Sequence, residues 1–178
     1  IDHWILSELN KLIHDVETGF ATYRFDLATQ RIYEFVWNEF CDWYLELAKV
    51  NLQSTDTKIR TSTINTLLTV LEAVLRIAHP FMPFITEELW QVVAPLFGKN
   101  TTVSLMIADY PDEQSFVSIE GLRIESEMRL TIEQLKQLIG VVRNLRAEMG
   151  LLPAVKVPLF IETASSNSYL RIQEYIKA

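Results

Sequence analysis

Basic side chains recur every seven residues in the last third of the chain, at Arg129, Lys136 and Arg143, and Arg146 lies one turn beyond them. Seven-residue spacing keeps side chains on nearly one face of a helix for several turns. Such a stripe can follow a phosphate backbone, because each cation that meets a phosphate releases a condensed counterion. The alternative is a solvated face on which the cations alternate with acidic residues such as Glu133.

A second group of polar side chains is expected at one end of a helix bundle. Short loops make successive helices antiparallel, so the first helix begins where the second ends and the third begins. Two helix N-termini favour an anion, and cations beside an aromatic ring suit phosphates and unstacked bases. The alternative is a solvated bundle end with Trp4 inside the core. The predicted site residues at this end are His3, Trp4, Ser7, Lys49, Asn51, Lys58, Arg60 and Thr61.

Residues that could support catalysis or bind a metal are scattered. His3, His14 and His79 lie in different predicted helices, and none has a second His or Cys at metal-ligand spacing. Cys41 lies within the most apolar helix, where it is expected to pack as a small hydrophobic residue. The sequence contains no glycine-rich phosphate loop and no nucleophile elbow. We therefore predict no catalytic residue, no metal site and no cofactor in this chain.

The helix expected to position these groups is centred on residues 35–49, FVWNEFCDWYLELAK, which contain no Gly or Pro and five aromatic residues. Helical periodicity places its polar residues on one narrow stripe, so the other sides should be packed by neighbouring helices. We expect its aromatic rings in the core. The stripe consists of Gln30, Glu34, Asn38, Asp42 and Glu46.

Capping residues and prolines set the expected boundaries of the other helices. A long connection, 100–118, is expected to contain an extended piece at Val103–Ile107. Gly150 is expected to cap the fifth helix, followed by an edge strand at Val155–Ile161, since it contains Pro158, and a short helix at Tyr169–Ile176. The five main helices are expected from an Asp2 cap to about Thr22, from an Asp26 cap over Leu27–Leu52, from Asp56 or Thr57 to His79, over Pro83–Gly98 and over Ile119–Met149.

Composition places the chain among globular helical proteins. It has 178 residues, of which 49% are hydrophobic and 22% charged, with only five glycines and six prolines. We predict an all-α antiparallel bundle over residues 1–149 and a small α/β appendage over 150–178. The net charge of −7 argues against non-specific nucleic-acid binding but leaves room for a local basic patch.

A single cysteine excludes an internal disulfide and suits a reducing compartment. The sequence shows no signal peptide and no apolar run long enough to span a bilayer, so we expect a cytoplasmic protein. Because it begins at Ile1, without an initiator Met, and enters a helical pattern at once, we expect it to be a piece of a longer protein.

Four segments together resemble the anticodon-binding helical domain of bacterial valyl-tRNA synthetases. They are Asp2–Ile5 (DHWI), Phe35–Lys49, His79–Gln91 (HPFMPFITEELWQ) and Val142–Gly150 (VRNLRAEMG), and the similarity runs from residue 1 to about 162. The resemblance implies a monomeric enzyme that joins valine to its tRNA through a valyl-adenylate, using ATP. Its nucleotide-binding and editing domains would precede this segment, and a coiled-coil arm would follow it.

The resemblance also implies a role for this segment. It would hold the anticodon stem-loop of tRNA(Val), would contact the enzyme's own catalytic domain and would catalyse nothing by itself. In related synthetases the anticodon lies at the bundle end where the first helix begins and the second ends. The family usually has Arg where His3 stands, followed by an aromatic residue that Trp4 matches, and Pro where Val50 stands. A protonated His3 can replace one cationic contact, and Lys156 with the fifth helix would contact the backbone secondarily.

Two alternatives remain at this point. One is the equivalent domain of an isoleucyl-tRNA synthetase, which a change of tRNA partner would distinguish. The other is a helical protein–protein interaction module that uses the Phe81–Phe84 corner and Trp90 as its contact surface. The overall acidity slightly favours the second alternative.

Overall fold

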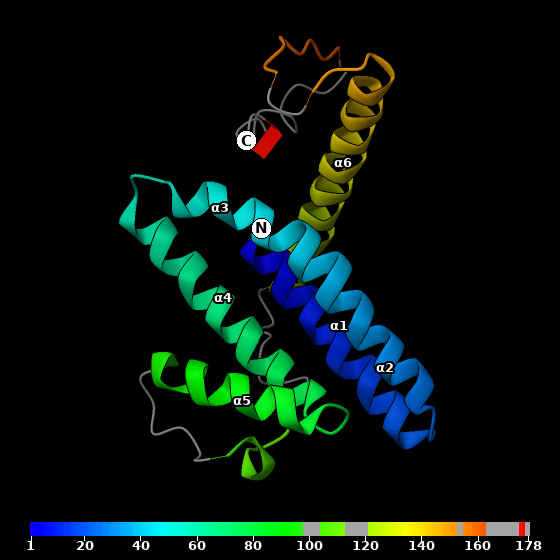
Figure 1. Ribbon diagram of the computed structural model, residues 1–178, viewed down its shortest axis with the longest axis vertical. Coiled ribbons are helices and arrows are strands. Elements are labelled where there is room, and N and C mark those ends of the chain that lie inside the picture. The colour runs from blue at the N-terminus through cyan, green and yellow to red at the C-terminus, as the bar shows by residue number, and fades with distance from the viewer. Residues whose placement is uncertain (98–103, 113–120, 153–154, 163–174, 177–178) are drawn as a thin grey trace. The chain divides into compact units, whose positions relative to one another are not determined.

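The computed structural model describes residues 1–97, 104–112, 121–152, 155–162 and 175–176. The chain separates into two compact units, residues 1–125 and 126–178. All regular elements among the described residues are helical, so the all-α prediction is confirmed. The elements are α1 (Asp2–Ala21), α2 (Phe25–Glu34), η1 (Phe35–Tyr44), α3 (Leu45–Leu52), α4 (Thr57–Ala78), α5 (Pro83–Val93), η2 (Ala94–Phe97), η3 (Leu105–Ile107) and α6 (Gly121–Glu148) (Figure 1).

Helices α1 and α2 form a closely packed antiparallel hairpin. A Cβ atom added to Gly19 would lie only 2.9 Å from the Cβ atom of Ala28, so the two backbones approach too closely for a larger residue. The turn passes through Tyr23, whose φ of 56° is left-handed. The predicted Asp26 cap is wrong: α2 begins at Phe25, two residues earlier than predicted, with Arg24 at the N-cap. The Asp26 carboxylate instead accepts two hydrogen bonds from Arg24, of 2.9 and 2.7 Å. The core-facing side of α1 is fully buried and includes Ile5, Leu9, Leu12, Ile13 and Val16.

The predicted central helix is continuous from Phe25 to Leu52 (Figure 1). Its middle third, η1, is wound as a π-helix. Bonds in a π-helix run from residue i to i+5. This winding aligns Phe35 with Phe40 on the buried side and Trp37 with Asp42 on the exposed side. The prediction that every aromatic ring of this helix lies in the core is therefore wrong for Trp37, which is 56% exposed. Its ring stacks on Tyr33, with centroids 6.4 Å apart.

Helix α4 begins at the predicted Asp56 cap, whose Oδ1 accepts a hydrogen bond from the Lys58 backbone N–H at 2.8 Å. At its other end, the side chain of His79 reaches the first turn of α5, with Nδ1 2.8 Å from Thr86 Oγ1. Because the Thr86 hydroxyl donates to the Met82 carbonyl at 2.7 Å, the imidazole must donate its Nδ1–H to Thr86. Pro83 occupies the start of α5, as predicted.

The segment 104–112 is anchored to α5 by Glu87. The Glu87 carboxylate accepts hydrogen bonds from Ser104 Oγ at 3.0 Å and from the Leu105 N–H at 2.9 Å. Desolvation opposes ionisation, but hydrogen bonds from Gln91, Ser104 and Leu105 together lower the pKa of Glu87. Residues Leu105–Ile107 form a 3₁₀ turn, so the prediction of an extended piece is wrong for these residues, and Val103 lies outside the described residues.

At the end of α6, Gly150 has a φ of 65°, which confirms the predicted left-handed cap. The predicted strand over 155–161 does not form, and all seven of these residues are exposed. A strand needs a partner, and none exists among the described residues, while the Arg146 guanidinium donates to the Leu152 and Val155 carbonyls at 2.8 and 2.9 Å. Most of the predicted helix at 169–176 lies outside the described residues, and the predicted boundary at residue 149 stays a prediction.

Candidate nucleic-acid interface at one end of the bundle

The expected meeting of three helix ends is confirmed by a set of hydrogen bonds centred on Asp2. Its carboxylate accepts from Tyr44 Oη at 2.9 Å, Thr63 Oγ1 at 3.0 Å and Ser62 Oγ at 3.5 Å. Asn51 Nδ2 donates to Thr63 Oγ1 at 3.2 Å. This Asp2 clasp, formed by Asp2, Tyr44, Asn51, Ser62 and Thr63, joins the start of α1 to the end of the central helix and the start of α4.

The clasp changes the role predicted for Asp2. Its side chain makes no capping hydrogen bond to α1, because the carboxylate turns to hydroxyl donors on other helices. The start of α4 is also occupied by an anion, the Asp56 carboxylate. Neither helix N-terminus therefore offers the bare positive end that the prediction of an anion site assumed. Attraction for phosphate at this end must come from cationic side chains.

Five of the predicted site residues have exposed side chains at this bundle end: His3, Lys49, Lys58, Arg60 and Thr61. Lys58 and Arg60 lie in the first turns of α4, and neither has a carboxylate partner within the described part of the chain. Lys49, by contrast, contacts Glu46 Oε1 at 2.6 Å, so a phosphate would have to compete for it. His3 is exposed in the first turn of α1. Lys58 and Arg60 are thus the cations best able to meet a ligand without breaking an existing ion pair.

The remaining predicted residues at this end support the fold. Trp4 is only 5% exposed, which is the core position left open as an alternative, so its ring offers no free face on which a base can stack. Ser7 is half-buried. Asn51 is half-buried in the Asp2 clasp and holds Thr63, which is fully buried. Trp4 and Asn51 therefore shape the surface from beneath it.

The basic residues predicted along the fifth helix lie on α6, in the second unit. Arg129 forms an ion pair with Glu133 at 3.2 Å, so the cations do alternate with acids there. Arg143 is exposed and Lys136 is half-buried. Arg146 is engaged with the carbonyls beyond Gly150, as described above. Only a part of the stripe is therefore available to a phosphate backbone.

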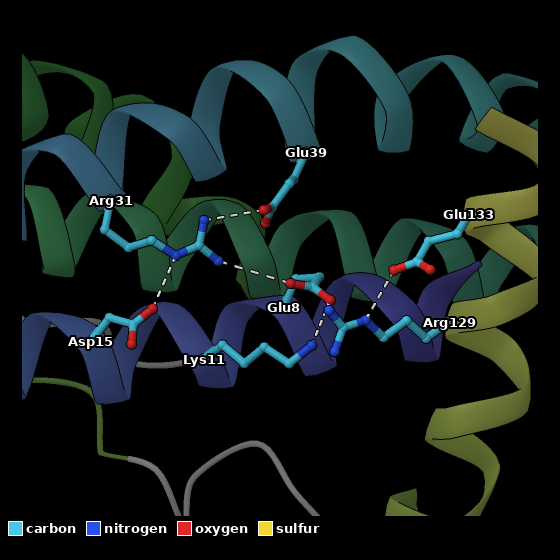
Figure 2. Close-up of polar contacts among 7 residues, drawn as sticks. All are labelled: Glu8, Lys11, Asp15, Arg31, Glu39, Arg129 and Glu133. Atoms are coloured by element: carbon cyan, nitrogen blue, oxygen red, sulfur yellow. Dashed lines mark hydrogen bonds and ion pairs between the residues drawn. The ribbon is translucent and has the colours of Figure 1, made fainter. Parts of the chain in front are cut away.

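A polar cluster that the sequence analysis did not foresee holds α1 and the central helix together (Figure 2). Arg31 contacts Asp15 at 3.1 Å, Glu39 at 3.1 Å and Glu8 at 3.8 Å, and Lys11 contacts Glu8 at 2.7 Å. The side chains of Glu8, Arg31 and Glu39 are largely buried. One signal was present: Glu8 and Asp15 are seven residues apart on one face of α1.

Neither a metal-binding group nor a membrane-spanning helix occurs in the described part of the chain. The residues that the structure describes contain no group of His, Cys, Asp or Glu side chains arranged to hold a metal ion. Among the same residues, each helix is too short or too polar to span a lipid bilayer.

The protein-interaction surface predicted around Trp90 is wrong for that residue, which is buried in a small cluster with Leu75, Ala94 and Leu105.

Comparison with known proteins gives a consistent result. A family model described as the anticodon-binding domain of tRNA ligase matches residues 2–161. A valine--tRNA ligase of Chromobacterium violaceum is 50% identical over 169 residues, which are 94% of this chain and 17% of that protein. The corresponding protein of Neisseria meningitidis serogroup B is 48% identical over 177 residues, 99% of this chain and 18% of the relative. A third, from Acinetobacter baylyi, is 41% identical over 174 residues, 97% and 17%. The chain thus spans less than a fifth of the length of these relatives.

Proposed function

Because the chain belongs to the family of anticodon-binding domains of tRNA ligases, we propose that it binds the anticodon stem-loop of tRNA(Val) as one domain of a longer valine–tRNA ligase. The valine--tRNA ligases among its relatives support this choice over an isoleucyl enzyme. The longer, monomeric enzyme would use ATP to attach valine to its tRNA in the cytoplasm. In this proposal the domain itself holds no cofactor and supplies no catalytic residue.

The observation that carries the proposal is the coincidence of the Asp2 clasp with exposed cations. The clasp holds three helix ends together. Lys58 and Arg60, which have no carboxylate partner among the described residues, lie just beyond it at the start of α4. A cation of this kind can neutralise a phosphate at no cost in lost ion pairs, and counterion release then favours binding.

The role that we propose for each predicted residue follows from the exposure of its side chain. Lys58 and Arg60 would contact phosphates of the loop, and Lys49 would do so by exchanging its contact with Glu46. His3 would supply a hydrogen bond to a phosphate or to a base edge. Trp4 would act only through the core, where it supports the first turn of α1. Because Trp4 is buried, we assign no base-stacking role to it.

The test is fluorescence anisotropy of the chain with a valine anticodon stem-loop, at low and moderate salt, beside an isoleucine stem-loop of the same length. We expect tighter binding to the valine loop and a loss of affinity as salt rises. Equal binding to both loops would contradict the assignment to valine. Absence of salt-dependent binding to either loop, in this chain and in the intact synthetase, would refute the anticodon role.

A further inference from the structure

Helix α5 has an apolar outward face that no residue in the described part of the chain covers. Phe84 is 89% exposed, and four aliphatic residues follow it at helical spacing into η2. We call this set the α5 face; it consists of Phe84, Ile85, Leu89, Val92 and Leu96. Counted from Ile85, the four aliphatic residues lie at i, i+4, i+7 and i+11, which is the spacing of a single helix face. The four aliphatic side chains from Ile85 to Leu96 share one helix face, and Phe84 lies beside it in the first turn of α5.

The inward side of the same helix is already packed. Thr86 and Trp90 are buried, and Trp90 contributes to the cluster with Leu75, Ala94 and Leu105. The α5 face is therefore additional to the surface that holds α5 in the bundle. Its five side chains expose on the order of 500 Å² of apolar surface, which is near the upper end for the largest patch of a soluble monomer. Patches of this size commonly mark interfaces.

The charges around the α5 face indicate a protein partner. Helix α5 contains no Lys or Arg, and its two charged residues, Glu87 and Glu88, are acidic. Glu87 is occupied by Ser104 and the Leu105 N–H, while Glu88 is exposed. A polyanion such as RNA would meet repulsion and find no counter-charge here. A nonpolar protein surface would remove the aliphatic side chains from water without such a cost.

The size of the α5 face favours a partner within the same polypeptide. A stable dimer needs about 800 Å² from each copy, more than this face offers. A surface linked to the domain through the backbone has a high effective concentration, so a smaller patch suffices. The relatives are more than five times as long as the segment they share with this chain. We propose that the α5 face docks onto a nonpolar surface of the remaining body of the synthetase chain, an inference that rests on the proposed function.

The experiment compares side-chain oxidation by hydroxyl radicals in the 178-residue chain and in the intact synthetase that contains it. We expect oxidation of Phe84 and Leu89 to be about fivefold lower in the intact synthetase, because the centre of an interface excludes water. Leu89→Glu should restore oxidation of Phe84 in the intact protein. The matched control is Leu27→Glu on α2, since Leu27 is 48% exposed and Leu89 is 44% exposed. This control should leave Phe84 protected.

Each other outcome overturns the docking proposal. Equal oxidation of Phe84 in the two proteins would show that the α5 face is bare in the synthetase. Protection that grows with the concentration of the 178-residue chain would assign the face to a second copy. Protection of Phe84 that requires the anticodon stem-loop would assign the α5 face to RNA. Loss of this protection in Leu27→Glu would show that docking of the α5 face does not cause the protection. Stem-loop binding is measured on the same samples: binding without protection refutes docking alone, and protection without binding refutes the anticodon role alone.

Discussion

Replacing Lys58 and Arg60 together with Ala should reduce the salt dependence of stem-loop binding and leave the fold intact. Both side chains are exposed and lack a carboxylate partner among the described residues. The contacts that these residues make to the fold come from their backbone N–H groups, which donate to Asp56 and are retained in alanine. The double variant therefore removes two cations from the surface without removing a structural hydrogen bond.

The magnitude follows from the number of phosphates released. Each phosphate neutralised on a single strand contributes about 0.7 to the slope of log affinity against log salt, so the double variant should lose about 1.4 of that slope. A fourfold rise in salt should then weaken binding of the double variant about sevenfold less than that of the wild type. Lys49→Ala should change the slope less, because Lys49 must first give up Glu46.

The assay is anisotropy with the valine anticodon stem-loop across a salt series, with circular dichroism as the check on folding. Arg24→Ala serves as the control for a lost positive charge, because Arg24 lies in the turn between α1 and α2, at the opposite end of α1. A double variant with the slope of the wild type would refute the placement of Lys58 and Arg60 in the site. If Arg24→Ala lowers the slope by as much for each charge removed, the effect comes from the net charge and not from the position of Lys58 and Arg60.

Two further predictions concern stability and pH. Arg31→Ala removes the cation shared by Glu8 and Glu39, so the free energy of unfolding in urea should fall by about 3 kcal/mol; an unchanged value would mean that water already solvates the cluster. The hydrogen bonds from Arg24 lower the pKa of Asp26 to about 2, so the stability that this pair contributes is present above pH 4 and is lost as the pH falls toward 2. An NMR titration of Asp26 should have its midpoint near 2 and move to about 3.9 in Arg24→Ala, and a midpoint near 3.9 in the wild type would disprove the pairing.

The features that sequence analysis predicted correctly depend on short-range chemistry. Asp56 is a short acceptor directly before a helical pattern, and Gly150 follows one directly, so each boundary is encoded by its own residue. The meeting of three helix ends followed from loop length alone, which is why it could be predicted without knowledge of the Asp2 clasp. The predicted fold class depended on the same local rules, applied to each helix in turn.

The errors concern features that depend on partners distant in sequence. The carboxylate of Asp2 could be a cap or a cross-link, and the hydroxyl that decides between them is 61 residues away. Trp37 was predicted to lie in the core because its position was read with the α-helical repeat. The π-helical winding of η1 aligns different residues along the helix, and residue types alone do not distinguish the two windings. The strand predicted over 155–161 has the right composition, but a strand depends on its neighbours more than on its own residues. Arg31 gave no local sign of the carboxylates that it would meet on α1 and η1.

The Asp2 clasp also has a consequence for the energetics of recognition. The first turn of a helix ordinarily frays, because its backbone N–H groups have no partner within the helix. Here Asp2 ties that turn to Tyr44 and Thr63, so the surface that carries His3 is already ordered before a ligand arrives. Immobilising a flexible chain on binding reduces affinity, and a surface that is rigid in advance avoids most of that loss. In the proposed function, a preorganised bundle end would let a domain of net charge −7 bind an anionic loop with only a few cationic contacts.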